Sequence, residues 1–392
     1  MKFIHRSGLT VDLNANREFA NVAICWTYKS GFRDDPEGLA GLIHVGEHMV
    51  FEQSCGNSTE SLELRAARNG MMTGAKTLPD CTQITVLCQR GEVGAALRLH
   101  RPGSPLGEQN HFESAVRAVE VETEDSLARH QGHREPWVEL HSQLYRSWNL
   151  SHDGFGYEVH KLRGRYGLVH DVLSTAFSPR NCILTVYGDF ENLDVHSYLD
   201  ELPLSAEGVA APSDVPVARR RTDCTDSSVR AASHIRGFAT SGPENSLTDY
   251  VYLWLAVEAL KLRLPNINVS LGVFGPLRSL TPETLVVSDR NGRAVEADSL
   301  RSDMLRSIAE PSESIFQRAK LHLQLALHQE VSGKQGAVST LGRLSALCGP
   351  HVSLDGLQAV WSELEPSNLN EGTALLLAAL EESMKTKPGA KR

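Results

Sequence analysis

The feature that most constrains the fold is the order of strand and helix patterns, which recurs on both sides of a break in composition. Residues 206–232 are small, polar and proline-bearing, without hydrophobic periodicity, and therefore predict a linker. On each side of it, strand and helix patterns follow a similar order. The 392 residues suffice for two domains. We therefore expect two related α+β domains, residues 1–205 and 233–392.

The N-terminal half alternates between the periodicities of strands and helices. The expected elements are strands over 20–31 and 181–190, a hairpin over 71–91, and helices over 36–54, 60–70 and about 111–148. Pro36 and Glu37 favour the start of a helix, and Gly70 favours the end of one. Pro79 and Asp80 predict the turn of the hairpin.

The C-terminal half carries the same kinds of pattern. The expected elements are strands over 232–242 and 285–289 and helices over 245–264, 313–331 and 370–385. Asn245 or Ser246 is the expected N-cap of the first of these helices. Residues with evident chemistry concentrate in the N-terminal half, so we expect the reaction to belong there.

The net charge and the cysteines limit the partners and the cellular compartment that we expect for this protein. The net charge of −9 argues against nucleic acid or an anionic membrane as the main partner. The seven cysteines include no CxxC pair, which favours free thiols in a reducing compartment. The N-terminus lacks the apolar region of a secretory signal, and no run of residues is apolar enough to span a bilayer. We expect a cytoplasmic protein.

One helical segment carries a possible metal site, His44, Glu47 and His48. Residues four apart lie on one face of a helix, so the two imidazoles can point at one ion. A catalytic zinc takes three protein ligands and makes a bound water more acidic, and Glu47 is placed to accept the proton. The alternative is one solvated face of an amphipathic helix. A third ligand is sought among the carboxylates of the acidic helix after His111: Glu113, Glu120, Glu122, Glu124 and Asp125.

The surroundings of these residues resemble a known family. "SGFRDDPEGLAGLIHVGEHMVFEQS" is similar to the signature of the pitrilysin/insulinase zinc peptidases, especially their mitochondrial-processing-peptidase-like branch. Similarity continues in "ARNGMMTGAKTLPDCTQITV", in "TAFSPRNCILTVYGDFENLDVHSYLDELPLS", and in a helix pair over 313–349. The resemblance implies a LuxS/processing-peptidase-like fold in which each domain is a mostly antiparallel sheet packed against helices.

The resemblance also implies roles for the acidic and histidine residues. His44 and His48 would be ligands of Zn²⁺ and Glu47 the general base. The family's third ligand is a glutamate on a later helix, and Glu122 fits, with small or apolar residues three and four positions before it. Glu120 is the rival, but it would place Arg117 at a position where the helix should pack, so we prefer Glu122. The family often has another glutamate two turns before the ligand, where the Glu122 register has Ala115 but the Glu120 register has Glu113.

Substrate contacts are implied less completely. Residues 71–77 would form an edge strand that binds an extended peptide, with Gly74, Ala75 and Thr77 as the contact positions, although Gly74 replaces the family's Asn. Arg278 would bind the substrate backbone, but Leu285 replaces the Tyr that accompanies this Arg in the family.

The expected activity is zinc-dependent cleavage of peptides or unfolded precursor segments, which could include leader peptides. Family members of this length form half of a closed chamber, so a homodimer or a heterodimer with a related subunit is expected. The alternative is a non-catalytic or partner-dependent subunit of a heterodimer. Retention of His44, Glu47 and His48 favours the enzyme.

Overall fold

The chain forms two compact units, each built from separate segments. In this computed structural model the described residues are all except 18–19, 52–59, 105, 146, 191–193, 203, 205–227, 233–234, 241, 244–245, 281–282, 292–301, 303–312, 350–353 and 386–392. The first unit comprises Met1–Arg129, Asp153–Asp214 and Glu330–Gly349; the second comprises His130–His152, Val215–Gln329 and Pro350–Arg392. Most of the predicted linker, 206–232, lies outside the described residues.

A mixed six-stranded sheet forms the centre of the first unit. Its strands are β1 (Lys2–Ile4), β2 (Thr10–Ala15), β3 (Asn21–Tyr28), β4 (Met72–Thr77), β5 (Thr82–Gln89) and β6 (Cys182–Gly188). Their order is β1-β2-β6-β3-β5-β4, and only the β2–β6 pair is parallel. The strands β3 and β6 and the β4–β5 hairpin were predicted. The sequence prediction omitted β1 and β2, and β4 is an edge strand among the described strands.

Strand β3 is buried on both faces, which explains its nearly continuous apolar sequence. Successive side chains of a strand point to opposite faces. One set, Val22, Ile24, Trp26 and Tyr28, belongs to the main core beneath the helices. The other set, Ala23 and Cys25, packs with Val338, which comes from a helix near the C-terminal end of the chain.

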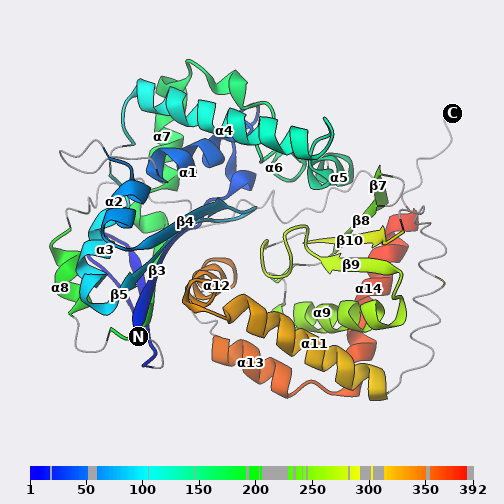
Figure 1. Cartoon of the computed structure of the whole chain (residues 1–392). Helices are drawn as coiled ribbons and strands as arrows, with labels where there is room; N and C mark the ends of the chain where they lie inside the picture. The colour runs from blue at the N-terminus through cyan, green and yellow to red at the C-terminus, as the bar shows by residue number, and fades with distance from the viewer. Residues whose placement is uncertain are drawn as a thin grey trace. The chain divides into compact units, whose positions relative to one another are not determined.

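Helices cover both faces of this sheet (Figure 1). They are α1 (Leu42–Phe51), α2 (Leu62–Arg68), α3 (Val93–Leu99), α4 (Gln109–Arg129), α7 (Tyr166–Ala176), α8 (Val195–Asp200) and α12 (Lys334–Leu347). Short 3-10 turns are η1 (Phe32–Asp34), η2 (Arg90–Glu92), η3 (Val159–Leu162) and η4 (Pro179–Asn181). Helix α1 packs against α4 and α7, whereas α12 packs against β3, β5 and β6.

Helix α1 begins later than its sequence predicts. Pro36 and Glu37 were expected to open it, but its first residue is Leu42. Gly38 and Gly41 have φ values of 79° and 83°, which end any regular helix before that point. The Asp35 carboxylate instead accepts the backbone N–H groups of Gly41 and Ile43, at 2.7 and 2.8 Å, and so caps the start of the helix.

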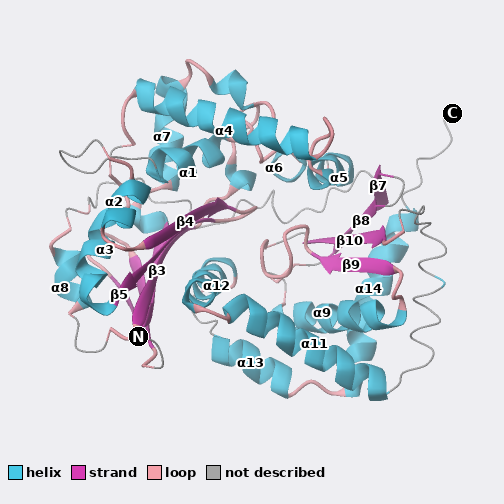
Figure 2. Cartoon of the chain, in the orientation of Figure 1, coloured by secondary structure: helices cyan, strands magenta, loops and turns pink. Residues whose placement is uncertain are grey.

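The second unit combines a four-stranded antiparallel sheet with helices (Figure 2). Its strands are β7 (Ser228–Ala232), β8 (Ile235–Thr240), β9 (Ile267–Leu271) and β10 (Glu283–Asp289), in the order β7-β8-β10-β9. Its helices are α5 (Pro136–Leu144), α6 (Trp148–Ser151), α9 (Leu247–Arg263), α11 (Glu313–Val331), α13 (Leu354–Ser362) and α14 (Pro366–Lys385). Both units thus mix sheet and helix, which confirms the α+β class.

Of two helices predicted in this part of the chain, one is divided and one begins at its expected cap. The single helical pattern expected over 111–148 is divided into α4, α5 and α6, because Gln131 and Gly132 adopt φ values of 55° and 86° between the first two. The Ser246 cap of α9 is confirmed, since its side chain accepts the backbone N–H of Asp249. Among the described helices, none combines the length and the apolar character needed to cross a bilayer.

Gly46 permits the close approach of α1 and α7 and provides a test of this packing. A Cβ at Gly46 would lie 2.4 Å from Phe177 Cε2 and 2.7 Å from Leu173 Cδ2, both on buried side chains. Although alanine favours a helix by ~1 kcal/mol over glycine, overpacking typically costs about 1–3 kcal/mol. We therefore expect Gly46→Ala to lower the urea midpoint of unfolding.

Gly167→Ala is the matched control for this substitution. Gly167 also lies in a helix of the first unit, α7, and nothing lies within 4 Å of the Cβ that it would acquire. Its midpoint should stay the same or rise slightly. Equal midpoints for both variants would contradict the packing described for Gly46.

Candidate metal centre

Helix α1 presents His44 and His48 on one side. The buried residues Leu42, Ile43, Val45, Met49 and Val50 hold the helix in the core of the first unit. His44 and His48 are one helical turn apart, and their ring centroids are separated by 5.1 Å. His44 is only 8% exposed, and His48 is partly buried. The two imidazoles therefore meet at a site with limited access to solvent.

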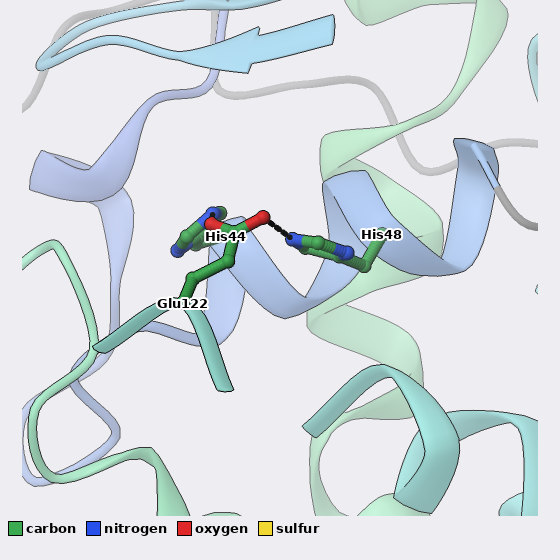
Figure 3. A group of neighbouring side chains, drawn as sticks. All are labelled: His44, His48 and Glu122. Atoms are coloured by element: carbon green, nitrogen blue, oxygen red, sulfur yellow. Dashed lines mark ion pairs between the residues drawn. The ribbon is translucent and has the colours of Figure 1, made fainter. Parts of the chain in front are cut away.

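Helix α4 brings Glu122 to both imidazoles (Figure 3). Its apolar stripe, which includes Phe112, Ala115, Val116 and Val119, is buried in the core, and Glu122 lies beside that stripe. Glu122 Oε2 is 3.4 Å from His44 Nε2, and Oε1 is 3.3 Å from His48 Nε2. The carboxylate thus lies between the two rings, with 48% of the Glu122 side chain exposed.

Glu120 and Glu113, the two glutamates of the rival register, contact other residues and not the histidines. Arg163 Nε donates to Glu120 Oε1 at 2.9 Å, and its Nη2 donates to the second oxygen of the same carboxylate. Glu113 accepts the backbone N–H of Gly164 at 2.6 Å. Glu113 and Glu120, seven residues apart, therefore both bind residues 163–164. Of the two candidate third ligands, the structure brings Glu122 to the histidines.

The three side chains fit a divalent metal ion. One ligand atom from each of His44, His48 and Glu122 lies within 4.8 Å of the others. In a tetrahedral zinc site with bonds of about 2.0–2.1 Å, neighbouring ligand atoms are about 3.3–3.4 Å apart. The nitrogen–oxygen separations of 3.4 and 3.3 Å involve different oxygens of Glu122, and each is close to that spacing. Two imidazoles and a carboxylate also form a donor set that suits zinc.

Charge in this group favours an ionised carboxylate facing protonated imidazole. Hydrogen bonds from His44 and His48 hold the pKa of Glu122 far below its usual range, although partial burial acts in the opposite direction. Burial lowers the pKa of His44, but its hydrogen bond with Glu122 and the charge of Glu47 outweigh this, so the pKa is raised. Below that raised pKa a cation competes with a proton for His44, so its binding should weaken as the pH falls through it.

Glu47 contacts the edge strand of the sheet. It is 8% exposed, and Thr77 Oγ1 of β4 donates a hydrogen bond to Glu47 Oε2 at 2.5 Å. Burial raises the pKa of Glu47, and the charge of His44 and the hydrogen bond from Thr77 oppose that effect only in part. A carboxylate with a raised pKa is better matched to proton transfer near neutral pH.

The other predicted contact positions are divided between the two units. Gly74, Ala75 and Thr77 all lie on β4, opposite Thr85, Ile84 and Thr82 of β5. A Cβ at Gly74 would be 3.3 Å from both Gln335 Nε2 and Thr85 Oγ1, so a larger side chain has little space there. Arg278 belongs to the second unit and is partly buried, and Leu285 of β10 is 0% exposed. The substrate role of Arg278 stays a prediction.

Sequence reasoning missed one contact of the site. His44 Nδ1 donates to the backbone carbonyl of Phe155 at 2.8 Å, which leaves Nε2 directed at Glu122. A backbone acceptor has no side-chain signature, so the sequence offers no direct sign of it. The only local signal is Asp153 followed by glycines at 154 and 156, a composition typical of a tight turn.

Comparison with known proteins establishes the fold. No protein-family model and no curated protein matches the chain. Among solved structures, a chain of Complex III2 from Candida albicans with Inz-5 bound has a TM-score of 0.72 and 14% identity, over 95% of this chain and 92% of that one. A putative M16-like peptidase from Alicyclobacillus acidocaldarius has a TM-score of 0.70 and 15% identity, with coverage of 95% and 94%. A protease from Helicobacter pylori has a TM-score of 0.73 and 14% identity, with coverage of 95% in both directions.

The chain therefore has the M16-like peptidase fold, the pitrilysin/processing-peptidase fold that the sequence resemblance predicted. At identities of 14–15% these likenesses concern the fold alone. The chemistry of the chain depends on the geometry of His44, Glu47, His48 and Glu122.

Two glutamates on α4 provide a matched test of the metal centre. Glu122→Gln replaces the carboxylate that faces the two imidazoles with a neutral amide. We expect it to weaken Zn²⁺ binding by at least about 100-fold, which exceeds the 10–100-fold effect typical of changes to outer-shell residues. Glu120→Gln alters a carboxylate that binds Arg163 and should leave the affinity unchanged. Competition with a chromophoric chelator measures both. Equal losses in the two variants would contradict this assignment.

Proposed function

We propose that the chain is a zinc-dependent endopeptidase that cleaves peptides or unfolded precursor segments. The observation that carries this proposal is the position of Glu47, which shares α1 with the candidate ligands His44 and His48 and accepts a hydrogen bond from the edge strand β4. His44, His48 and Glu122 would hold Zn²⁺, and Glu47 would be the general base. The M16-like peptidase fold supports the same assignment.

The protein's own residues would perform the proton transfers. When bound, zinc supplies Lewis acidity for an attacking water and for the carbonyl of the scissile bond. Glu47 would accept the proton of that water on its carboxylate and later donate it to the leaving amine. Thr77 would hold one oxygen of Glu47, leaving the other available for the proton.

Strand β4 would bind the substrate. An edge strand offers unpaired backbone groups to which an extended peptide can add as a further strand, whatever its sequence. Gly74, Ala75 and Thr77 lie on this strand, and Thr77 contacts the proposed base. A substrate that must be extended at the scissile bond is a peptide or an unfolded segment, so folded proteins should resist cleavage.

Glu47→Gln separates metal binding from turnover. The substitution keeps the shape of the side chain but removes the group that accepts a proton. We expect zinc content like that of the wild type and peptide cleavage reduced by at least about 100-fold, within the range attributed to general acid–base catalysis. Zinc analysis and a fluorogenic peptide assay measure the two properties. Similar cleavage by both proteins would exclude this mechanism.

We also propose that the chain consists of two related domains, predicted over residues 1–205 and 233–392, that act with a partner. The compact units follow this division except that 130–152 belongs to the second and 330–349 to the first. Each unit contains a sheet with antiparallel pairing and packed helices. Two positions where the resembled family carries Glu and Tyr are here the buried Ala115 and Leu285. A second chain, either a copy or a related subunit, would then supply substrate contacts. A chain of similar fold occurs in Complex III2 from Candida albicans.

The same two residues favour the alternative of a partner-dependent subunit. Because the side chains of Ala115 and Leu285 are apolar and 0% exposed, neither position offers a polar contact to a substrate. We expect light scattering after gel filtration to give twice the mass of one chain, or peptide cleavage to appear only with a related subunit. A monomer that is fully active alone would contradict the proposal of a partner.

A further inference from the structure

Residues 153–157, termed here the Asp153 loop, form a compact turn beside the metal centre. Asp153 is 8% exposed, and its carboxylate accepts three backbone N–H groups of the same loop. These come from Phe155 at 3.0 Å, Gly156 at 3.2 Å and Tyr157 at 2.5 Å. A buried carboxylate with three such donors fixes the path of the backbone around it.

The first link of the loop is to α1. The carbonyl of Phe155 accepts the Nδ1–H of His44 at 2.8 Å, and the two rings lie 5.9 Å apart with an interplanar angle of 31°. Gly41, just before α1, is close to the loop, because a Cβ there would lie 2.9 Å from Gly156 Cα. The hydrogen bond assigns the proton of a neutral His44 to Nδ1 and leaves Nε2 as the nitrogen that can bind a metal.

The second link of the loop is to α4, which carries Glu122. Gly156 has φ of 109°, and a Cβ on it would lie 2.8 Å from Val119 Cγ1, so glycine is needed for this approach. Tyr157 Oη and Ser126 Oγ are hydrogen-bonded at 3.0 Å. Val119 and Ser126 precede and follow Glu122 on the buried side of the helix. The loop thus contacts both helices that carry the candidate ligands.

We propose that Asp153 is a positioning residue of the metal centre. Through the loop it fixes the ring orientation and tautomer of His44 and the separation of α1 from α4. This inference rests on the proposed metal centre but does not depend on turnover. Outer-shell partners of ligating histidines typically contribute 10–100-fold to metal affinity. An ordinary surface turn at this place would contribute to folding only, and metal affinity would not depend on Asp153.

The test replaces Asp153 by asparagine. One carboxylate oxygen becomes an NH₂ group, so at least one of the three backbone N–H groups loses its acceptor while the side-chain volume is kept. Asp194→Asn is the matched control, because Asp194 also accepts a backbone N–H, that of Ser197, at the start of α8. Tyr157→Phe is a second variant that removes the hydroxyl bonded to Ser126 and leaves the backbone N–H that contacts Asp153 in place.

Two measurements separate a positioning role from a purely structural one. Zn²⁺ affinity is obtained by chelator competition, and the absorption of bound Co²⁺ reports the geometry of the ligands. We expect Asp153→Asn to weaken Zn²⁺ binding by about 10–100-fold and to change the Co²⁺ spectrum, while circular dichroism shows a folded protein. Asp194→Asn should match the wild type, and Tyr157→Phe should show a smaller loss of affinity.

The outcomes distinguish this inference from the proposed function. If the wild type binds no Zn²⁺, the metal centre and the inference both fail. If the wild type binds Zn²⁺ and both loop variants bind it equally well, with an unchanged Co²⁺ spectrum, only the inference fails. If Asp153→Asn does not fold, an affinity of Tyr157→Phe equal to that of the wild type overturns the inference, and a selective loss supports it.

Discussion

The contact of the Glu122 carboxylate with His44 and His48 is the interaction on which the candidate metal centre depends. It requires α1 and α4 to lie close together, and apolar packing around Ala115 and Val119 provides that approach. The polar group itself lies at the edge of this packing, where solvent is only partly excluded and ionic contacts are stronger than in bulk water. Hydrophobic burial thus positions the helices, and electrostatics selects how the side chains meet.

The proposed base and the edge strand are held in the same rigid frame. Thr77 joins β4 to Glu47, and Arg33 joins the segment before α1 to Asp80 in the turn after β4, at 3.0 Å. The side chains of Arg33 and Asp80 are 1% and 0% exposed. Removing one partner of a buried ion pair leaves an uncompensated charge, at a cost of roughly 3–5 kcal/mol. A peptide added to β4 would therefore meet Glu47 at a defined distance.

The first unit is completed by residues from distant parts of the sequence. Gln83 donates to the backbone carbonyl of Ser339, 256 residues away, at 2.8 Å. Gly342 of α12 packs so closely on Thr27 that a Cβ would lie 2.3 Å from its hydroxyl oxygen. The periodic patterns suggested contiguous halves, whereas the compact units are assembled from separate segments. Patterns report which face of an element is apolar, and they do not report which sheet buries that face.

The sequence by itself determined the elements whose periodicity is local, such as α11 over Glu313–Val331, and the alignment of His44 with His48. Both follow from the geometry of a single helix, which a pattern of residue types can express. The sequence favoured Glu122 over Glu120, and only the tertiary structure shows which of them faces the imidazoles, because both lie on α4 and packing determines their directions. The tertiary structure also supplied the Phe155 carbonyl, since every residue has a backbone acceptor and only the folded chain directs one of them at His44.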